Sequence, residues 1–310
     1  MLVRNPPVQV ADRFLMLGTS EYPLYLYRGD REGLLFEGGT GAMGPLVAEQ
    51  LKRLAIPPDF IRQAVVTHAH PDHVMAVPAL RAMFPGIAVL GSAAAARTLE
   101  SPKAMGFFRQ VDEALTGALL KAGRIREEHR PAPLPQDRIA IDRTIGEGDT
   151  VAVGANAAFQ VLATPGHSEC SLSFHEPKAR ILVISDATGY YMPDEKYWWP
   201  NYFTGYGAYL DSMRRLAGLG AEALAISHNA AVTGAADVAA YFAGALAATE
   251  AYHARIVAET KAGKAVREIA EELGAEVHAR AGLLALEFFQ KNCGVLVKQS
   301  LRQEGMLPCL

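Results

Sequence analysis

Short apolar runs alternate with amphipathic stretches along the first three quarters of the chain. Most runs are bounded by Gly or Pro and have the length of strands: Leu24–Tyr27, Leu34–Phe36, Ala64–Thr67, Ala88–Leu90, Phe159–Ala163, Leu172–Phe174, Ile181–Ser185 and Ala223–Ser227. Helical spacing lies between them, at Pro45–Leu54, Val74–Phe84, Ala93–Leu99 and Tyr209–Gly218. This alternation predicts an α/β protein whose helices cover the faces of its sheets.

Two segments depart from this alternation. Residues 101–130 have helical spacing only and predict a helical insert. After about residue 235 no strong strand pattern remains, and three helices are expected, the second with Gly274 as its stop. We therefore predict a catalytic domain over residues 1–235 and a helical C-terminal region over residues 236–310 that packs on the side of the active site.

Composition narrows the classes of partner. The net charge of −3 provides no strong field for nucleic acid or an anionic membrane. Three cysteines, Cys170, Cys293 and Cys309, match no zinc or disulfide framework, which favours a reducing compartment. The N-terminus lacks the apolar core of a signal peptide, and no apolar stretch approaches the roughly 20 residues of a membrane span. We expect a cytoplasmic protein without a nucleic-acid or membrane partner.

The stretch "VVTHAHPDHV" concentrates metal-binding side chains directly after an apolar strand. His68, His70, Asp72 and His73 fall within six positions there. Because an α/β protein usually binds ligands at the carboxyl edge of its sheet, the loop is well placed for a site. A zinc ion takes about four ligands, so further residues must complete the site.

Three later residues follow apolar runs in the same way. They are His167, Asp186 and His228. A single histidine after a strand is ordinarily structural, but this ordered set suits two ions. We expect one ion to bind the set His68, His70 and His167, and the other the set Asp72, His73 and His228. Asp186 could bridge the ions because its carboxylate has two oxygens. We expect structural roles for the other histidines, His129, His175, His253 and His278.

The segments "THAHPDH", "TPGHS", "SDA" and "SHN" resemble the ordered metal-binding motifs of the metallo-β-lactamase superfamily. This resemblance covers roughly residues 14–235 and implies an αββα four-layer sandwich with a dinuclear site at one edge. "LLFEGGTGA" is similar to an early turn of that fold, with Glu37 as outer support for the ligands. The chain departs from the family at Val74–Ala76, where two glycines are common, and around His228, which lies between Ser227 and Asn229.

Two divalent ions in such a site can activate a shared water molecule as a nucleophile. Asp72 is the expected catalytic residue, because it could accept or pass on the proton of that water. Zinc is favoured as the metal, and iron or manganese also suit these ligands. Cys170 lies close to His167 in sequence, but we expect it to be a small buried residue at the start of a strand, with a structural and not a catalytic role.

The sequence excludes several branches of the superfamily that the chain resembles. Its common drug-degrading zinc enzymes have Cys in place of Asp186 and are exported, and its flavodiiron members replace His70 by a carboxylate. Its RNA-processing nucleases carry a large domain between the last two ligands, but Asp186 and His228 are only 42 positions apart. Esters, thioesters and lactones remain as substrate classes.

An aromatic block follows Asp186. Nine of the twenty residues from 190 to 209 are aromatic, which suits a partly aromatic or apolar acyl group of medium size. We expect about half of them to pack on the C-terminal helices and Tyr191, Trp198 and Tyr202 to line the pocket. Phe107 of the insert is a further candidate, with the insert as a lid or, alternatively, a homodimer interface. The helical insert, the aromatic block and the helical tail together resemble the quorum-signalling thioesterase branch of this superfamily, whose best-known member acts on 2-aminobenzoylacetyl-CoA.

The sequence thus predicts a dinuclear metal-dependent hydrolase of an ester or thioester. One alternative is a hydroxyacylglutathione hydrolase, in which cations of the helical tail such as Arg255 and Lys264 would hold the glutathione carboxylates. A lactone hydrolase is another. An alternative of a different class is a regulatory or partner-binding protein with a vestigial hydrolase site.

Overall fold

The computed structural model describes residues 1–57, 59–134 and 137–307, so Cys309 lies outside the described residues. The chain forms two compact units. Unit 1 comprises Met1–Ala163, Cys170–Ser185 and Ala221–Val238. Unit 2 comprises Thr164–Glu169, Asp186–Gly220 and Ala239–Leu310.

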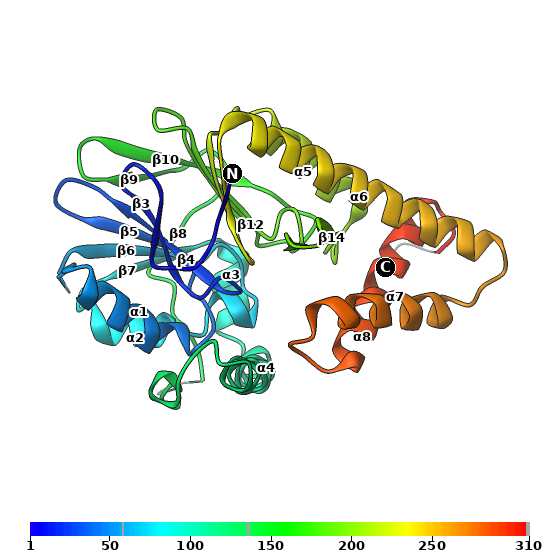
Figure 1. The fold of residues 1–310 in the computed structure, drawn as a ribbon, viewed down its shortest axis with the longest axis horizontal. Helices are drawn as coiled ribbons and strands as arrows, with labels where there is room; N and C mark the ends of the chain where they lie inside the picture. The colour runs from blue at the N-terminus through cyan, green and yellow to red at the C-terminus, as the bar shows by residue number, and fades with distance from the viewer. Residues whose placement is uncertain (58, 135–136, 308–310) are drawn as a thin grey trace. The chain divides into compact units, whose positions relative to one another are not determined.

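Unit 1 contains two seven-stranded sheets (Figure 1). The first has the order β2 (Val8–Ala11), β3 (Phe14–Gly18), β4 (Pro23–Arg28), β5 (Gly33–Phe36), β6 (Ile61–Val65), β7 (Ala88–Gly91) and β8 (Arg143–Thr144). The second has the order β1 (Leu2–Val3), β16 (Ala231–Thr233), β15 (Ala223–Ile226), β12 (Ile181–Ser185), β11 (Leu172–Glu176), β10 (Ala157–Ala163) and β9 (Thr150–Val153). Strands β5 to β8 run parallel, and so do β12 and β15.

Large apolar side chains from both sheets form one core. The ring of Phe36 on β5 lies 4.8 Å from that of Phe159 on β10 and 5.3 Å from that of Phe174 on β11. All three rings are fully buried. The hydroxyl of Tyr25 on β4 lies 2.7 Å from the carbonyl oxygen of Ile226 on β15. The two sheets therefore pack face to face as a sandwich.

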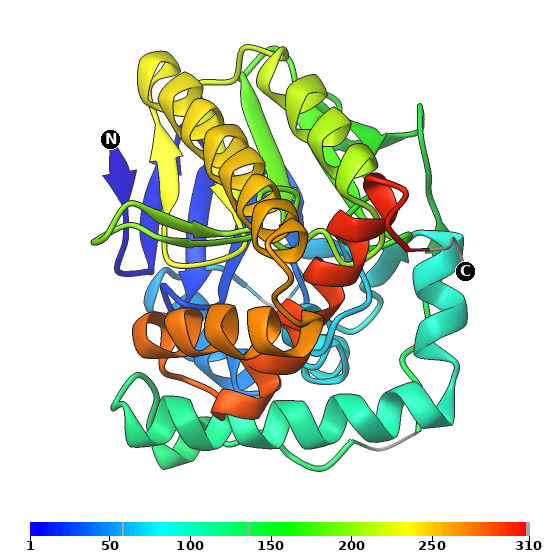
Figure 2. The same ribbon diagram turned by 90° about the vertical axis from the view of Figure 1, so that its right-hand side faces the viewer.

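The helices of unit 1 are α1 (Met43–Arg53), α2 (Val77–Met83), α3 (Ala93–Leu99) and α4 (Pro102–Lys121), with the short 3-10 helices η1 (Pro71–His73) and η2 (Glu127–His129). Helix α1 packs against α2 and β3. Ser92 caps α3 by accepting the Ala95 amide at 3.1 Å, and Ser101 caps α4 in the same way. Figure 2 shows α4, the predicted insert, along its length.

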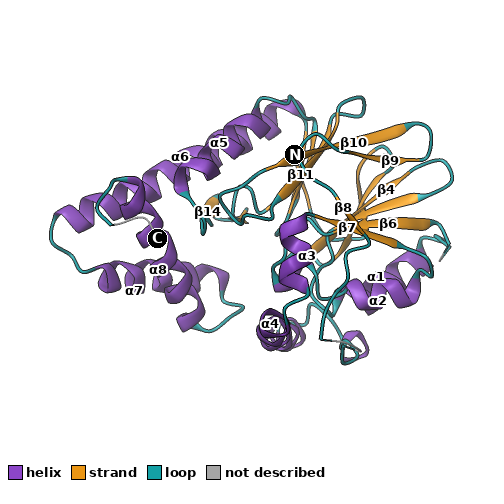
Figure 3. Cartoon of the chain, turned by 180° about the vertical axis from the view of Figure 1, so that it is seen from behind, coloured by secondary structure: helices purple, strands orange, loops and turns teal. Residues whose placement is uncertain are grey.

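Unit 2 is mainly helical (Figure 3). It contains α5 (Tyr206–Ala217), α7 (Val266–Ala281), α8 (Leu286–Gln303), most of α6 (Ala235–Lys261) and a hairpin of β13 (Tyr190–Met192) and β14 (Tyr197–Trp199). Its core joins aromatic residues of the 190–209 block with apolar residues of α7 and α8. This packing accounts for much of the aromatic content of that block.

The predicted end of the second C-terminal helix at Gly274 is wrong. Helix α7 continues through Gly274 and ends before Gly282, which has a left-handed φ of 58°. A Cβ on Gly274 would lie 2.6 Å from the Cα of Gln290 on α8. This glycine therefore allows two helices to approach closely within unit 2.

The other predicted elements form near their expected places. Helix α2 begins at Val77 rather than Val74, because the amides of Met75 and Ala76 donate to the carbonyls of Gly39 and Gly38 instead of starting a helix. Several strands were not predicted from the sequence, such as β3 and β9.

The division at residue 235 into a catalytic domain and a helical region stays a prediction. None of the described helices combines the length and the apolar content that a bilayer crossing requires.

The shared core of the two sheets leads to a prediction on stability. We expect Phe159→Ala to lower the free energy of unfolding by about 3–5 kcal/mol, because it leaves a cavity among packed rings. Phe107→Ala is the control: Phe107 is 56% exposed, and its loss should change stability by no more than about 0.5 kcal/mol. Chemical denaturation measures both variants, and equal effects would contradict this account of the core.

Candidate metal centre

The ends of parallel strands position six of the seven predicted ligands. The loop with His68, His70, Asp72 and His73 follows β6, which runs parallel to its neighbours β5 and β7. His228 follows β15 by two residues, and Asp186 directly follows β12, the parallel partner of β15. Side chains distant in sequence thus leave their sheets at carboxyl ends.

Asp72, His73 and His228 form one group within unit 1. Each offers a ligand atom, and these atoms lie within 4.8 Å of one another. The Nε2 atoms of His73 and His228 lie 3.4 and 3.7 Å from Oδ2 of Asp72. The histidines are buried, whereas the Asp72 side chain is 22% exposed.

The other ring nitrogen of each histidine in this group is anchored. Nδ1 of His73 lies 2.8 Å from Oε2 of Glu37, and the hydroxyl of Thr67 donates to the same oxygen at 2.9 Å. Nδ1 of His228 lies 2.8 Å from the carbonyl oxygen of Glu21. Since a carbonyl oxygen can only accept, Nδ1 of His228 carries the proton and Nε2 has its lone pair available. Metal-binding histidines are usually oriented by such a bond on the opposite nitrogen.

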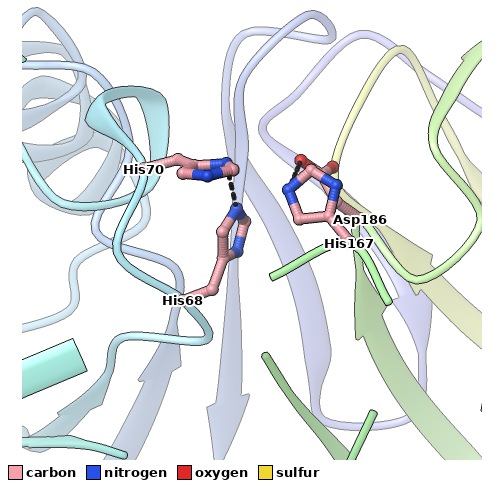
Figure 4. A group of neighbouring side chains, drawn as sticks. All are labelled: His68, His70, His167 and Asp186. Carbon is pink, nitrogen blue, oxygen red and sulfur yellow. Dashed lines mark hydrogen bonds and ion pairs between the residues drawn. The ribbon is translucent and has the colours of Figure 1, made fainter. Parts of the chain in front are cut away.

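The second group of candidate ligands consists of His68 and His70 in unit 1 and of His167 and Asp186 in unit 2 (Figure 4). Nε2 of His68 lies 3.1 Å from Nδ1 of His70. Nε2 of His167 lies 3.3 Å from Oδ2 of Asp186. Nδ1 of His167 donates to the carbonyl of Asn201 at 2.9 Å, so this ring also directs Nε2 toward its group.

Together the two groups contain the six residues of the predicted ligand sets and Asp186, whose predicted bridging role stays a prediction. The remaining histidines, His129, His175, His253 and His278, belong to neither group. Imidazole and carboxylate donors of this kind suit zinc, iron or manganese. The donor set therefore fits divalent metal, while the individual ligand roles stay predictions.

Strained backbone adjoins the candidate ligands. Glu37, Ser185 and Asn229 have positive φ angles of 75°, 47° and 67°. Glu37 contacts His73, Ser185 precedes Asp186, and Asn229 follows His228. Such conformations cost of order 1–3 kcal/mol each and concentrate at functional sites. The strain fits a site whose side-chain directions matter more than local stability.

The loop of His167 is fixed by contacts within unit 2. The carbonyl of Gly166 accepts the amides of Thr204 and Gly205 at 3.0 and 3.3 Å. Gly166 has a φ of 119°, and a Cβ there would lie 2.3 Å from the Cα of Tyr209. Only glycine therefore allows this loop to pack against the start of α5.

The residues predicted to line the pocket have different environments. Tyr191 is buried, and its ring lies 4.5 Å from that of the half-buried Trp198. Tyr202 is fully buried in the core of unit 2, with its hydroxyl 2.8 Å from that of Ser300, which favours a packing role. Phe107 is exposed on α4. Their roles in substrate binding remain predictions.

Three features of the site were not predicted from the sequence. The half-buried ring of Phe203 lies 5.3 Å from that of His167, although only its membership of the aromatic block hinted at a role. The carbonyls of Glu21 and Asn201 orient His228 and His167, and a backbone acceptor cannot be recognised from the residue type.

Cys170 is buried, and its Sγ accepts the amide of Ala69 at 3.2 Å. This contact agrees with the structural role expected for Cys170.

Comparisons with known proteins agree with this geometry. The family model of the metallo-beta-lactamase superfamily matches residues 23–228. A hydroxyacylglutathione hydrolase of Chelativorans sp. (strain BNC1) is 27% identical over 54% of this chain and 52% of its own length. One from Fuscovulum blasticum is 27% identical over 46% of this chain and 40% of its own length. The chain thus spans about half the length of the curated relatives it matches.

Solved structures share the fold at low identity. A metallo-beta-lactamase family protein from Thermus thermophilus has a TM-score of 0.61 and 21% identity, over 94% of this chain and 93% of that chain. The subclass B3 metallo-beta-lactamase BJP-1 of Bradyrhizobium japonicum has a TM-score of 0.57 and 17% identity, over 84% and 97%. The predicted α/β sandwich of the metallo-β-lactamase type, with its helical C-terminal region, is thereby confirmed. Since the family model matches more than half of this chain, the chain belongs to the metallo-beta-lactamase superfamily.

Proposed function

We propose that this protein is a metal-dependent hydrolase that cleaves an ester or thioester bond of a medium-sized acyl substrate. The observation that carries the proposal is the group of Asp72, His73 and His228, whose ligand atoms lie within 4.8 Å of one another. Bound divalent ions would supply the positive charge that makes water a strong nucleophile near neutral pH and polarises a carbonyl. The superfamily consists mostly of metal-dependent hydrolases, which supports the reaction class of this proposal.

Asp72 is the best candidate to hold and move a proton. Its Oδ2 lies beside Nε2 of both His73 and His228, and its side chain is far more exposed than either ring. A carboxylate that contacts both the ligand group and solvent can take a proton from attacking water and release it again. The buried carboxylate of Asp186 has less access to solvent for that exchange.

The aromatic ring of Phe203 supports an apolar or aromatic acyl group. It lies against the ring of His167 and keeps part of its surface exposed. A substrate whose carbonyl approaches the ligands of this group would place the adjoining acyl carbons near such a ring. Face or edge contacts with an aromatic ring add about 0.5–1.5 kcal/mol to simple burial.

Glutathione thioesters are the second candidate, because relatives at 27% identity are named hydroxyacylglutathione hydrolases. Two cations of the helical tail, Arg255 and Lys264, give this candidate little support. Arg255 pairs with Glu259 and Glu276, and Lys264 pairs with Glu259 and Glu272. Since these charges are already engaged with acids of their own region, we rank acyl thioesters with an apolar group first.

Metal removal tests the reaction class. We expect complete chelation to abolish hydrolysis of a panel of acyl-CoAs, aryl esters, lactones and lactoylglutathione, and zinc to restore it. His228→Ala should lose both bound metal and activity, because it removes a ligand of the unit 1 group. His278→Ala is the matched control and should keep both, since His278 belongs to neither group. Turnover that survives metal-free conditions would refute the proposal.

The proton role of Asp72 has its own test. Asp72→Asn keeps an oxygen near His73 and His228 but cannot accept a proton at neutral pH. We expect kcat to fall by about 10²–10⁴-fold at saturating metal. Measured metal content serves as the control, because a fall in kcat that follows metal loss alone would assign Asp72 a ligand role only.

Acyl preference tests the role of Phe203. We expect Phe203→Leu to lower the ratio of kcat/KM for an aryl thioester over an acetyl thioester by about 2- to 10-fold, the equivalent of one lost aromatic contact. Phe107→Leu is the matched control on the insert and should leave this ratio unchanged. The opposite pattern would assign the acyl group to the insert instead of to the loop beside His167.

A further inference from the structure

Helix α4 contains a buried carboxylate that the proposed reaction does not use. Asp112 lies in the middle of the helix and is only 6% exposed. Its Oδ1 accepts the amide of Gly41 at 2.7 Å. Burial and, to a lesser extent, the charge of Asp72 raise its pKa to about 6, against the effect of the Gly41 hydrogen bond. Placing an acid here costs free energy, so a compensating role is expected.

The partner of Asp112 belongs to a turn that supports the ligand loop. Residues 38–41 form this glycine-rich turn after β5. The amide of Gly38 donates to the carbonyl of His73 at 2.8 Å, and the amide of Met75 donates to the carbonyl of Gly39 at 2.9 Å. Main-chain hydrogen bonds from this turn therefore hold the C-terminal end of η1, which contains Asp72 and His73, and the residues directly after it.

Close approach of the acid to this turn requires glycine. A Cβ on Gly41 would lie 2.5 Å from Oδ2 of Asp112 and 3.0 Å from Pro131. Helix α4 also packs directly against η1. The insert thus contacts the ligand loop itself and, through Asp112, the turn that supports it.

We propose that Asp112 is a positioning residue for the metal group of Asp72, His73 and His228. Its hydrogen bond fixes the turn at residues 38–41, which holds the end of η1, and a buried negative charge on the helix that packs against η1 favours a cation near that group. This inference rests on the proposed metal binding. It makes the α4 insert part of the metal centre, whether or not the helix also covers the substrate.

The test compares Asp112→Asn with Asp149→Asn in the full-length protein. Asparagine at 112 keeps an oxygen that can accept the Gly41 amide but removes the charge. Asp149 is the matched control, because it accepts the amide of Gly146 at 2.8 Å in an exposed turn outside both ligand groups. Zinc affinity for each of two ions is measured by competition with a chromophoric chelator, and thermal stability is recorded for each variant.

We expect Asp112→Asn to weaken binding of one of the two zinc ions by about 10- to 100-fold while the other ion binds as in the unchanged protein. Asp112→Ala, which also removes the acceptor for Gly41, should weaken it further, and Asp149→Asn should bind both ions normally. A folding defect alone would weaken both ions together, which would overturn the inference. Unchanged affinity in Asp112→Asn would overturn it as well while leaving the hydrolase proposal intact. An unchanged protein that holds no zinc, iron or manganese would refute both proposals.

Discussion

The candidate centre depends on hydrogen bonds that three of its imidazoles make through the ring nitrogen that faces away from the other candidate ligands. His73 is held by Glu37, His228 by the carbonyl of Glu21, and His167 by the carbonyl of Asn201. An unanchored imidazole rotates about its side-chain bonds and presents either nitrogen. Once Nδ1 is engaged, the orientation of the ring is fixed, so the cost of ordering these candidate ligands would be met during folding instead of during metal binding.

The core of the sandwich offsets the free energy that this ordering requires. Its fully buried rings, such as Phe36 and Phe159, come from both sheets and stabilise the body that carries the ligand loops. Against this, the backbone at Glu37 and Asn229 adopts conformations that non-glycine residues avoid. A large core that is remote from the chemistry can tolerate local strain beside it, and this division is common in enzymes.

Much of the site could be predicted from the sequence because its chemistry lies in side chains with distinctive types and order. His68, Asp72 and Asp186 could be recognised by their positions after apolar runs, and Glu37 could be assigned as support. Contacts that depend on the backbone or on tertiary approach could not be predicted. The carbonyl of Asn201 has no sequence signature, Gly274 looked like a helix stop because its contact with Gln290 is remote in sequence, and Asp112 resembles any acid on an amphipathic helix. The aromatic block was visible, but periodicity could not show that Tyr202 is buried while Phe203 lies beside the candidate ligand His167.

The bonding of Gly166 bears on how this protein could diversify. Its carbonyl accepts two amides from the segment that follows Phe203, so main-chain atoms alone make these connections between the His167 loop and that segment. Replacing the side chain at position 203 therefore leaves them in place. Single substitutions at position 203 could therefore change the surface beside His167 over evolution without altering the backbone that holds this candidate ligand.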